Sequence, residues 1–432
     1  MNRWFEITER GSTPGRELRG AVATFLTMSY ILFANPSILA AAGVPFQAAA
    51  SGTALAAGLC SILMGLIANF PVALASGMGL NAVIAYQVAP ALGSWQAAMV
   101  LVVLDGLIVL VLVLVGLREA IMHAIPRDLR RAIGVGIGLF IAFIGAVNAR
   151  IIVVPAGTIQ ALTRDRTAIL PPVTHGVLDS AEPLIALTGL LVIAVLMVKR
   201  VTGAILIGIV ASTLLALLMG VTEPPSAVLA WPRFDTIVSP GSWFVPGLAA
   251  IPVLLSLVMV DFFDTIGTVT AIAEEARLSD DRGRPPRLSR ILTVDAASAS
   301  IGGLLGVSSV TSYIESAAGV AEGARTGLHS VIVGVLFLLA ILIAPLLSIV
   351  PSAATAPALI VVGFLMCQQI TRIEFRELDT AIPAFVLLIT IPFTYSISHG
   401  IGLGFISYVV IKLLTGHARD VHPLMLGTAA AF

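Results

Sequence analysis

The chain contains many long apolar runs that no charge interrupts, and this pattern restricts its fold more than any other feature. The run at 96–117 includes a single charged side chain, Asp105. Only 11% of all residues are charged, against about 25% in soluble domains, so most of the surface must face lipid. Transmembrane strands alternate in polarity, whereas helices satisfy their backbone within each apolar run. The chain is therefore predicted to be an all-α polytopic membrane protein.

Apolar runs bounded by charge, proline or glycine predict fourteen transmembrane segments. In the first half they are 18–41, 48–69, 72–90, 96–117, 132–149, 183–198 and 202–221. In the second half they are 249–274, 291–307, 311–324, 326–348, 354–371, 378–394 and 398–414. The predicted organisation is an N-terminal segment at 1–17, a seven-segment repeat at 18–221, an external linker at 222–248, a second repeat at 249–414 and a tail at 415–432.

The distribution of positive charge supports this count. If the N-terminus is cytoplasmic and every segment crosses, 20 of the 24 lysine and arginine residues lie on the cytoplasmic side. The positive-inside rule predicts this asymmetry, and losing one segment would reverse every later loop. The sequence therefore predicts a multi-pass protein of the plasma membrane, in contact with lipid, with both termini cytoplasmic.

The two halves resemble an inverted repeat. Seven crossings per repeat is an odd number, so the halves must have opposite orientations, as in many secondary transporters. The third segment of each half is polar where a spanning helix should be apolar. Segment 10 reads Ser308 to Ser312 before Glu315, which predicts a short extended stretch followed by a half-helix that begins near Glu315. Broken backbone at membrane depth is tolerated where it lines a cavity or is buried in protein.

Segment 8 carries two acids, Asp261 and Asp264, near the middle of an apolar stretch. A charged side chain at a helix centre costs about 2.5–3.5 kcal/mol on insertion scales, so such residues usually face a cavity or a partner. Burial and a second nearby carboxylate both disfavour the charged form. Asp264, and next to it Asp261, are therefore the candidate proton carriers. The alternative is a structural acid that is hydrogen-bonded to hydroxyls such as Thr265 or Thr268.

Glu315 is the main candidate for substrate binding. The free N–H groups and the positive dipole end of a half-helix would keep its carboxylate ionised. An ionised carboxylate accepts hydrogen bonds from ring N–H and amino groups. The alternative is an acid that only caps its own helix.

In segment 3, Asn81 offers a donor and an acceptor, and Gly79 lets backbone approach a ligand or pack against a helix. Ile314 and Thr268, which flank the acids, complete the candidate substrate-binding set. Asp105 in segment 4 and Asp295 in segment 9 are expected to pair with neighbouring helices or to lie near the interface.

Other classes of protein find little support. The net charge is zero, and the basic stretch at 282–287 is better interpreted as a cytoplasmic anchor than as a nucleic-acid site. Two isolated cysteines and scattered histidines predict neither a metal site nor a disulfide framework. The sequence has no zinc-protease, nucleophile-elbow or phosphate-loop motif. It therefore predicts no enzyme activity and no cofactor.

Several motifs resemble the AzgA-like purine permeases, a branch of the nucleobase–cation symporters (the nucleobase–ascorbate transporter superfamily). They are Met28 to Leu32 with Asn35 and Pro36, Gly77 to Ala82, Phe263 to Thr268, Tyr313 to Gly319, Gly323 to Leu328, and Thr394 to Ile397 with Gly400 to Gly402. Together they extend over nearly the whole chain. Ser76 stands where the family more often has proline, so the turn at this position departs from the pattern.

The resemblance implies two inverted repeats of seven segments, with short strands in segments 3 and 10, and a core domain beside a gate domain. It implies uptake of a purine base (guanine, hypoxanthine, adenine or xanthine) driven by protons, often by a homodimer. By position it assigns the segment 8 acid to Asp264, the segment 10 acid to Glu315 and the segment 3 polar residue to Asn81. Two alternatives remain: an anion carrier or channel of the same architecture, and a nucleobase carrier coupled to Na⁺.

Overall fold

The computed structural model describes residues 2–116, 125–164, 173–224, 231–237, 247, 250–279, 285–347 and 349–432. The predicted linker at 222–248 and the basic stretch at 282–287 lie partly outside these ranges.

The elements of the first half are α1 (Asn2–Phe5), α2 (Pro14–Met28), α3 (Ile31–Ala40), α4 (Phe46–Leu63), η1 (Met64–Ala68), β1 (Leu74–Ser76), α5 (Met78–Val83), η2 (Ile84–Val88), α6 (Ala89–Leu92), α7 (Trp95–Leu114), α9 (Arg127–Asn148), β2 (Ile152–Val153), α10 (Ala156–Arg164), β3 (Thr174–His175), α11 (Ala181–Val198) and α12 (Ala204–Leu218). The elements of the second half are α13 (Ile251–Glu275), α14 (Leu288–Leu304), β4 (Val310–Ser312), α15 (Ser316–Ala321), α16 (Gly327–Ala340), η5 (Ile341–Ile343), α17 (Ala344–Leu347), α18 (Ser352–Cys367), η6 (Gln368–Arg372), α19 (Leu378–Thr394), α20 (Ile397–Leu414), η7 (Ala418–Asp420) and α21 (Pro423–Ala431).

Each of the fourteen predicted segments coincides with a helix or with a strand followed by a helix. The predicted segment at 378–394 is α19, and the one at 398–414 is α20 within one residue. By length and composition, 8 of the described helices can cross a membrane, and four shorter apolar helices accompany them. The prediction of a helical multi-pass membrane protein is confirmed.

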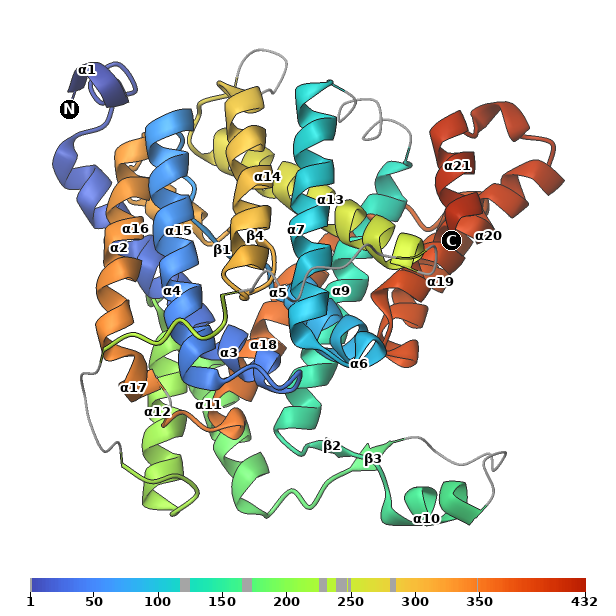
Figure 1. Ribbon diagram of the computed structural model, residues 1–432, viewed down its shortest axis with the longest axis horizontal. Coiled ribbons are helices and arrows are strands. Elements are labelled where there is room, and N and C mark those ends of the chain that lie inside the picture. The colour runs from blue at the N-terminus through green and yellow to red at the C-terminus, as the bar shows by residue number, and fades with distance from the viewer. Residues whose placement is uncertain are drawn as a thin grey trace.

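The helices pack in two groups (Figure 1). One group contains α2, α4, α7, α14, α15 and α16, which pack around the two strands β1 and β4. We call this group the core domain. The other group contains α9, α11, α12, α18, α19 and α20, and we call it the gate domain. Helix α13 packs mainly on the core domain and also contacts α9 and α20 of the gate domain.

Short strands break segments 3 and 10, as the resemblance implied. β1 and β4 pair antiparallel, with Ala75 opposite Thr311, and both strands are buried. The backbone N–H of Gly77 extends the pairing to the carbonyl of Ser309 at 2.8 Å. A Cβ atom on Gly77 would lie 2.9 Å from the Thr311 methyl group, so glycine is needed where the strands cross. This pairing joins the two halves in the middle of the core domain.

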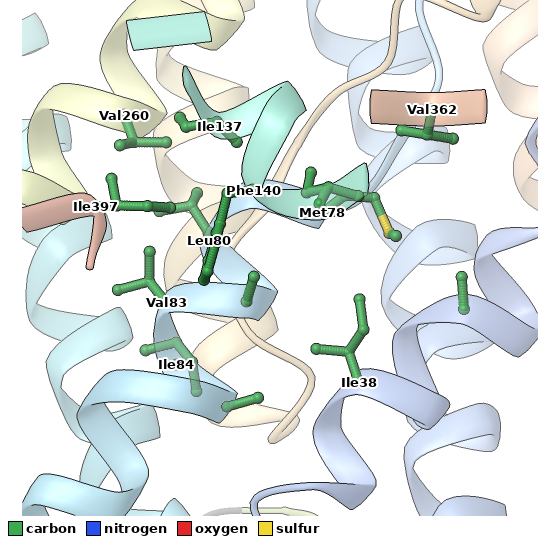
Figure 2. Close-up of a cluster of buried hydrophobic side chains, with 14 of the residues drawn as sticks. Ile38, Met78, Leu80, Val83, Ile84, Ile137, Phe140, Val260, Val362 and Ile397 are labelled. Atoms are coloured by element: carbon green, nitrogen blue, oxygen red, sulfur yellow. The ribbon is translucent and has the colours of Figure 1, made fainter. Parts of the chain in front are cut away.

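Apolar side chains fill the contact between the two domains (Figure 2). Met78, Leu80 and Val83 of α5 are buried there beside Ile137 and Phe140 of α9. Helix α5 itself carries no charged residue, so its contact with α9 consists of apolar side chains. Because dispersion contacts are individually weak and have no fixed direction, such a surface tolerates sliding.

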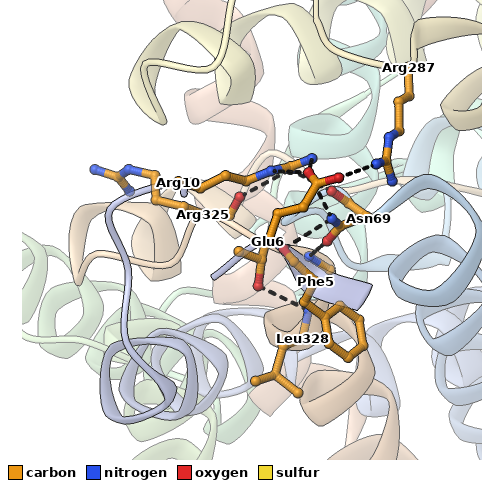
Figure 3. A network of polar contacts seen from close by, with 9 residues as sticks. Phe5, Glu6, Arg10, Asn69, Arg287, Arg325 and Leu328 are labelled. Carbon is orange, nitrogen blue, oxygen red and sulfur yellow. Dashed lines mark hydrogen bonds and ion pairs between the residues drawn. The ribbon is translucent and has the colours of Figure 1, made fainter. Parts of the chain in front are cut away.

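The N-terminal segment is fixed to the core domain by a polar network (Figure 3). Arg10 donates to Glu6 at 2.7 Å and to the carbonyl of Asn69 at 2.7 Å, while Asn69 donates to the carbonyl of Phe5 at 3.0 Å. Arg287, which precedes α14, donates to the same Glu6 carboxylate. Burial opposes ionisation of Glu6, but hydrogen bonds and charges from Arg10 and Arg287 outweigh it and hold the pKa of Glu6 below its usual value.

Candidate functional site

Glu315 lies at the break in segment 10, at the residue that precedes α15. Its side chain makes no capping hydrogen bond to α15, which contradicts the alternative that it serves only its own helix. Instead, its Oε1 atom accepts a hydrogen bond from the hydroxyl of Tyr30 at 2.7 Å. Tyr30 is buried in the break between α2 and α3. A carboxylate has about four lone-pair sites, so this bond leaves Glu315 able to accept from a ligand.

The contact of Tyr30 with Glu315 could not be predicted from segment 1 alone. In the sequence, Tyr30 is noted only as part of the motif Met28 to Leu32, because a tyrosine hydroxyl within an apolar run has no feature that identifies its partner. The structure marks the position by a break between α2 and α3 at Ser29 and Tyr30, and the apolar sequence there gives no sign of this break.

The two acids of α13 have different surroundings. Asp261 is fully buried, and its Oδ1 atom accepts from the Ser309 hydroxyl at 3.3 Å. Asp264 is exposed although it lies within a membrane helix, and the charges of Asp295 and Glu315 act on it. Asp264 is therefore the more accessible acid of this pair. Its role as the first candidate for the proton carrier stays a prediction.

Asp295 of α14 connects the acids to the strands. Its Oδ1 atom accepts from the backbone N–H of Ser312 at 3.0 Å and from the hydroxyl of the same residue at 2.8 Å. Its Oδ2 atom accepts from the Thr265 hydroxyl at 2.5 Å, and Thr265 also contacts the Thr311 hydroxyl at 3.0 Å. Pairing with neighbouring elements was expected, but the role of holding β4 against α13 was not. Asp295 thus fixes the strand that leads into Glu315.

The remaining candidates lie in distinct environments. Asn81 is fully buried in α5, and neither atom of its amide group has a hydrogen-bond partner among the described residues. Buried polar atoms without partners are rare and often meet a ligand or water. Ile314 is 48% exposed next to Glu315, and Thr268 is buried one turn after Asp264. A Cβ atom on Gly79 would lie 2.7 Å from Ile137, so this glycine allows α5 to approach α9.

The ion pairs of the described residues bear on the charge of Asp264 and Glu315. In the described part of the chain, neither Asp264 nor Glu315 takes part in an ion pair. Groups of three or more metal-ligating side chains are absent from the same ranges. The site therefore presents negative charge and hydrogen-bond acceptors, which suit a ligand with N–H donors or a proton.

An apolar cavity of about 290 Å³ lies elsewhere, between α7, α13 and α21. Ile108, Val258 and Leu424 are among its lining residues, and Thr428 supplies a hydroxyl. None of the candidate site residues lines it. None of the described residues that line this cavity is acidic, so they offer no carboxylate to a polar ligand.

A model of the Permease family (Xan_ur_permease) matches residues 15–403. The adenine permease AdeP of Escherichia coli (strain K12) is 40% identical over 437 residues, which cover 100% of this chain and 95% of that protein. The guanine/hypoxanthine permease PbuG of Bacillus subtilis (strain 168) is 40% identical over 446 residues, covering 100% and 98%.

A solved structure has the same fold at low sequence identity. The transmembrane domain of a cyanobacterium bicarbonate transporter, BicA, aligns with a TM-score of 0.60 and 18% identity, and the alignment covers 96% of this chain and 97% of that chain. The predicted architecture of fourteen segments in two inverted repeats agrees with this likeness.

Proposed function

Because this chain belongs to the Permease family of nucleobase transporters, we propose that it imports purine bases across the plasma membrane by symport with protons. Members of the family are permeases, so the chain is a transporter and not an enzyme. The proposed substrates are adenine, guanine, hypoxanthine and xanthine, which follow from the names of the relatives and from the predicted site. The AzgA-like branch, which the motifs indicated, remains a prediction.

The observation that supports this proposal best is the pair of carboxylates formed by Glu315, at the break in segment 10, and Asp264 on α13. Glu315 is held by Tyr30 and has lone pairs left to accept hydrogen bonds, and Asp264 is exposed near it on α13. A purine base carries a ring N–H group and, in adenine and guanine, an exocyclic amino group. Hydrogen bonds between such donors and a charged acceptor contribute about 1.5–3 kcal/mol each.

The same arrangement suggests how a proton could be coupled to the base. An ionised Asp264 beside the charges of Glu315 and Asp295 is unfavourable at this depth. Protonation of Asp264 removes one negative charge from the place where the base docks. Each ligand then raises the affinity for the other by the same factor.

Two alternatives are weaker on this site. The first alternative is an anion carrier, like the bicarbonate transporter of similar fold. Such a carrier needs a basic or uncharged site, because carboxylates repel anions. A Na⁺-coupled nucleobase carrier would use the same acids as cation ligands. The ion gradient that drives uptake distinguishes this second alternative from the proposal.

A competition experiment tests the class of substrate. We expect at least one purine base to displace a labelled purine from the purified protein, while bicarbonate at the same concentration does not. The reason is that Glu315 and Asp264 accept hydrogen bonds and repel anions. Displacement by bicarbonate without displacement by any purine would contradict the proposed function.

The proposed orientation places both termini in the cytoplasm. Figure 1 shows the N-terminal segment at one end of the molecule and β2, β3 and α10 at the other. We expect a cysteine at Val177, which is 70% exposed, to react from outside with an impermeant thiol reagent. A cysteine at the exposed position of Glu275 should react only after the membrane is permeabilised.

Both variants of this labelling experiment are made after Cys60 and Cys367 have been replaced by alanine. The reverse labelling pattern would contradict the orientation. We also propose a homodimer that is formed through the gate domain, which rests on the family resemblance alone.

A further inference from the structure

Asp105 is a buried acid that the proposed transport cycle does not use. It lies in the middle of α7, and its side chain is fully buried. Neither of its carboxylate oxygens accepts a hydrogen bond from any residue in the described ranges. A carboxylate that is buried without a donor is strongly disfavoured in its ionised form.

The surroundings of Asp105 place it next to Asp295 of α14. The two helices are in close contact here: a Cβ atom on Gly106 would lie 2.9 Å from the carbonyl of Ala296. The Ser300 hydroxyl donates to the carbonyl of Val103 at 3.2 Å at the same level. Asp295 is the charged group that acts on Asp105. Of the other elements packed on α7, α13 carries Asp261, Asp264, Glu274 and Glu275, and η2 carries Tyr86. Helix α14 also carries Arg290 in its first turn.

The two carboxylates have opposite hydrogen-bond environments. Asp295 accepts from the N–H and the hydroxyl of Ser312 and from the hydroxyl of Thr265. Three donors stabilise its ionised form. Asp105 has no donor, so when two carboxylates share a buried space, it is the one that takes up the proton.

We propose that Asp105 and Asp295 form a proton-binding site inside the core domain, in which Asp105 carries the proton and Asp295 remains ionised. This site is separate from Asp264, which faces the substrate. When the proton leaves Asp105, two negative charges remain side by side. The repulsion displaces Asp295 from Ser312 and Thr265.

This displacement would change the positions of the acids at the substrate site. Ser312 ends β4, three residues before Glu315, and Thr265 follows Asp264. A proton on Asp105 therefore keeps Glu315 and Asp264 in place, and Asp105 is a positioning residue for the base. This step rests on the proposed function, whereas protonation of Asp105 itself does not.

The first test measures the proton directly. Infrared spectra of the purified full-length protein at neutral pH are recorded for the wild type and for Asp105→Asn. We expect the difference spectrum to show the loss of a C=O band of a protonated carboxylic acid. The matched control is Asp379→Asn, because Asp379 is ion-paired with Lys412 and should lose only an ionised carboxylate band. An unchanged carboxylic acid band in Asp105→Asn would overturn the proposal, whether or not the protein binds purines.

The second test measures the linkage to the base. Affinity for the purine that binds best is measured from neutral to alkaline pH. We expect the affinity of the wild type to fall as Asp105 ionises, and the affinity of Asp105→Asn to fall less over the same pH range. The difference between the two losses should be a factor between about 5 and 150, the usual range of coupling between two sites. Superimposable profiles would overturn the positioning role. Should Asp105→Asn not fold, Asp105→Ser removes the same carboxyl group and is measured in both tests.

Discussion

Replacing Glu315 with glutamine is expected to weaken purine binding by about 10- to 150-fold, which corresponds to the loss of about 1.5–3 kcal/mol from one charge-assisted hydrogen bond. Glutamine keeps the shape of the side chain, and its oxygen can still accept from Tyr30. It loses the negative charge and turns one acceptor into a donor, which faces the donors of the base. Equilibrium binding to the purified variant measures this effect.

Two controls separate the role of Glu315 from a general disturbance. Glu182→Gln changes a glutamate of the gate domain that pairs with Arg150, and it should bind the base like the wild type. Tyr30→Phe removes only the hydroxyl that holds Glu315 and should weaken binding less than Glu315→Gln does. Wild-type affinity in Glu315→Gln would show that the base is recognised elsewhere.

Replacing Asp264 with asparagine is expected to abolish accumulation of the base against its gradient, while exchange of labelled for unlabelled base continues. Asparagine imitates the protonated acid permanently, so the proton gradient can no longer change the charge of the acid that faces the base. Binding is retained, because the charge that opposes docking has already been removed. Uptake and exchange in proteoliposomes, measured side by side, separate these two activities.

Asp261→Asn is the matched control for this experiment, since Asp261 lies one turn away on the same helix but is buried against Ser309. It should still accumulate the base in response to a proton gradient. Coupled uptake that survives in Asp264→Asn and fails in Asp261→Asn would assign the transported proton to Asp261 instead.

Much of the fold could be predicted because hydropathy is a local property. The segment at 378–394 was predicted with the observed bounds of α19, and even the polar segment 10 was correctly divided into an extended stretch and a half-helix near Glu315. The pairing of β1 with β4 is not visible in either segment alone, because it joins residues more than 200 positions apart. It was expected only from the family resemblance. The break of segment 1 at Tyr30 was not predicted, since the apolar run continues through it.

The candidate acids could be identified for a related reason: a charged residue within an apolar run is visible in the sequence without any knowledge of the fold. Their partners could not. Tyr30 and Glu315 are 285 residues apart, and only the packing of α2 against α15 brings the two together. The role of Asp295 depends on the packing of α14, α13 and β4, which no single segment reveals. From its position near the start of a segment, Asp295 could equally have been an interfacial residue or a buried one.

The most direct test of proton-driven purine transport uses the purified protein in liposomes with a neutral interior. A labelled purine base is added outside at acidic pH, with Na⁺ absent, and its internal concentration is followed with and without a protonophore. The proposed function predicts transient accumulation above the external concentration, which the protonophore eliminates and an imposed negative interior potential increases. Uptake that ignores the pH gradient and follows an inward Na⁺ gradient would contradict it.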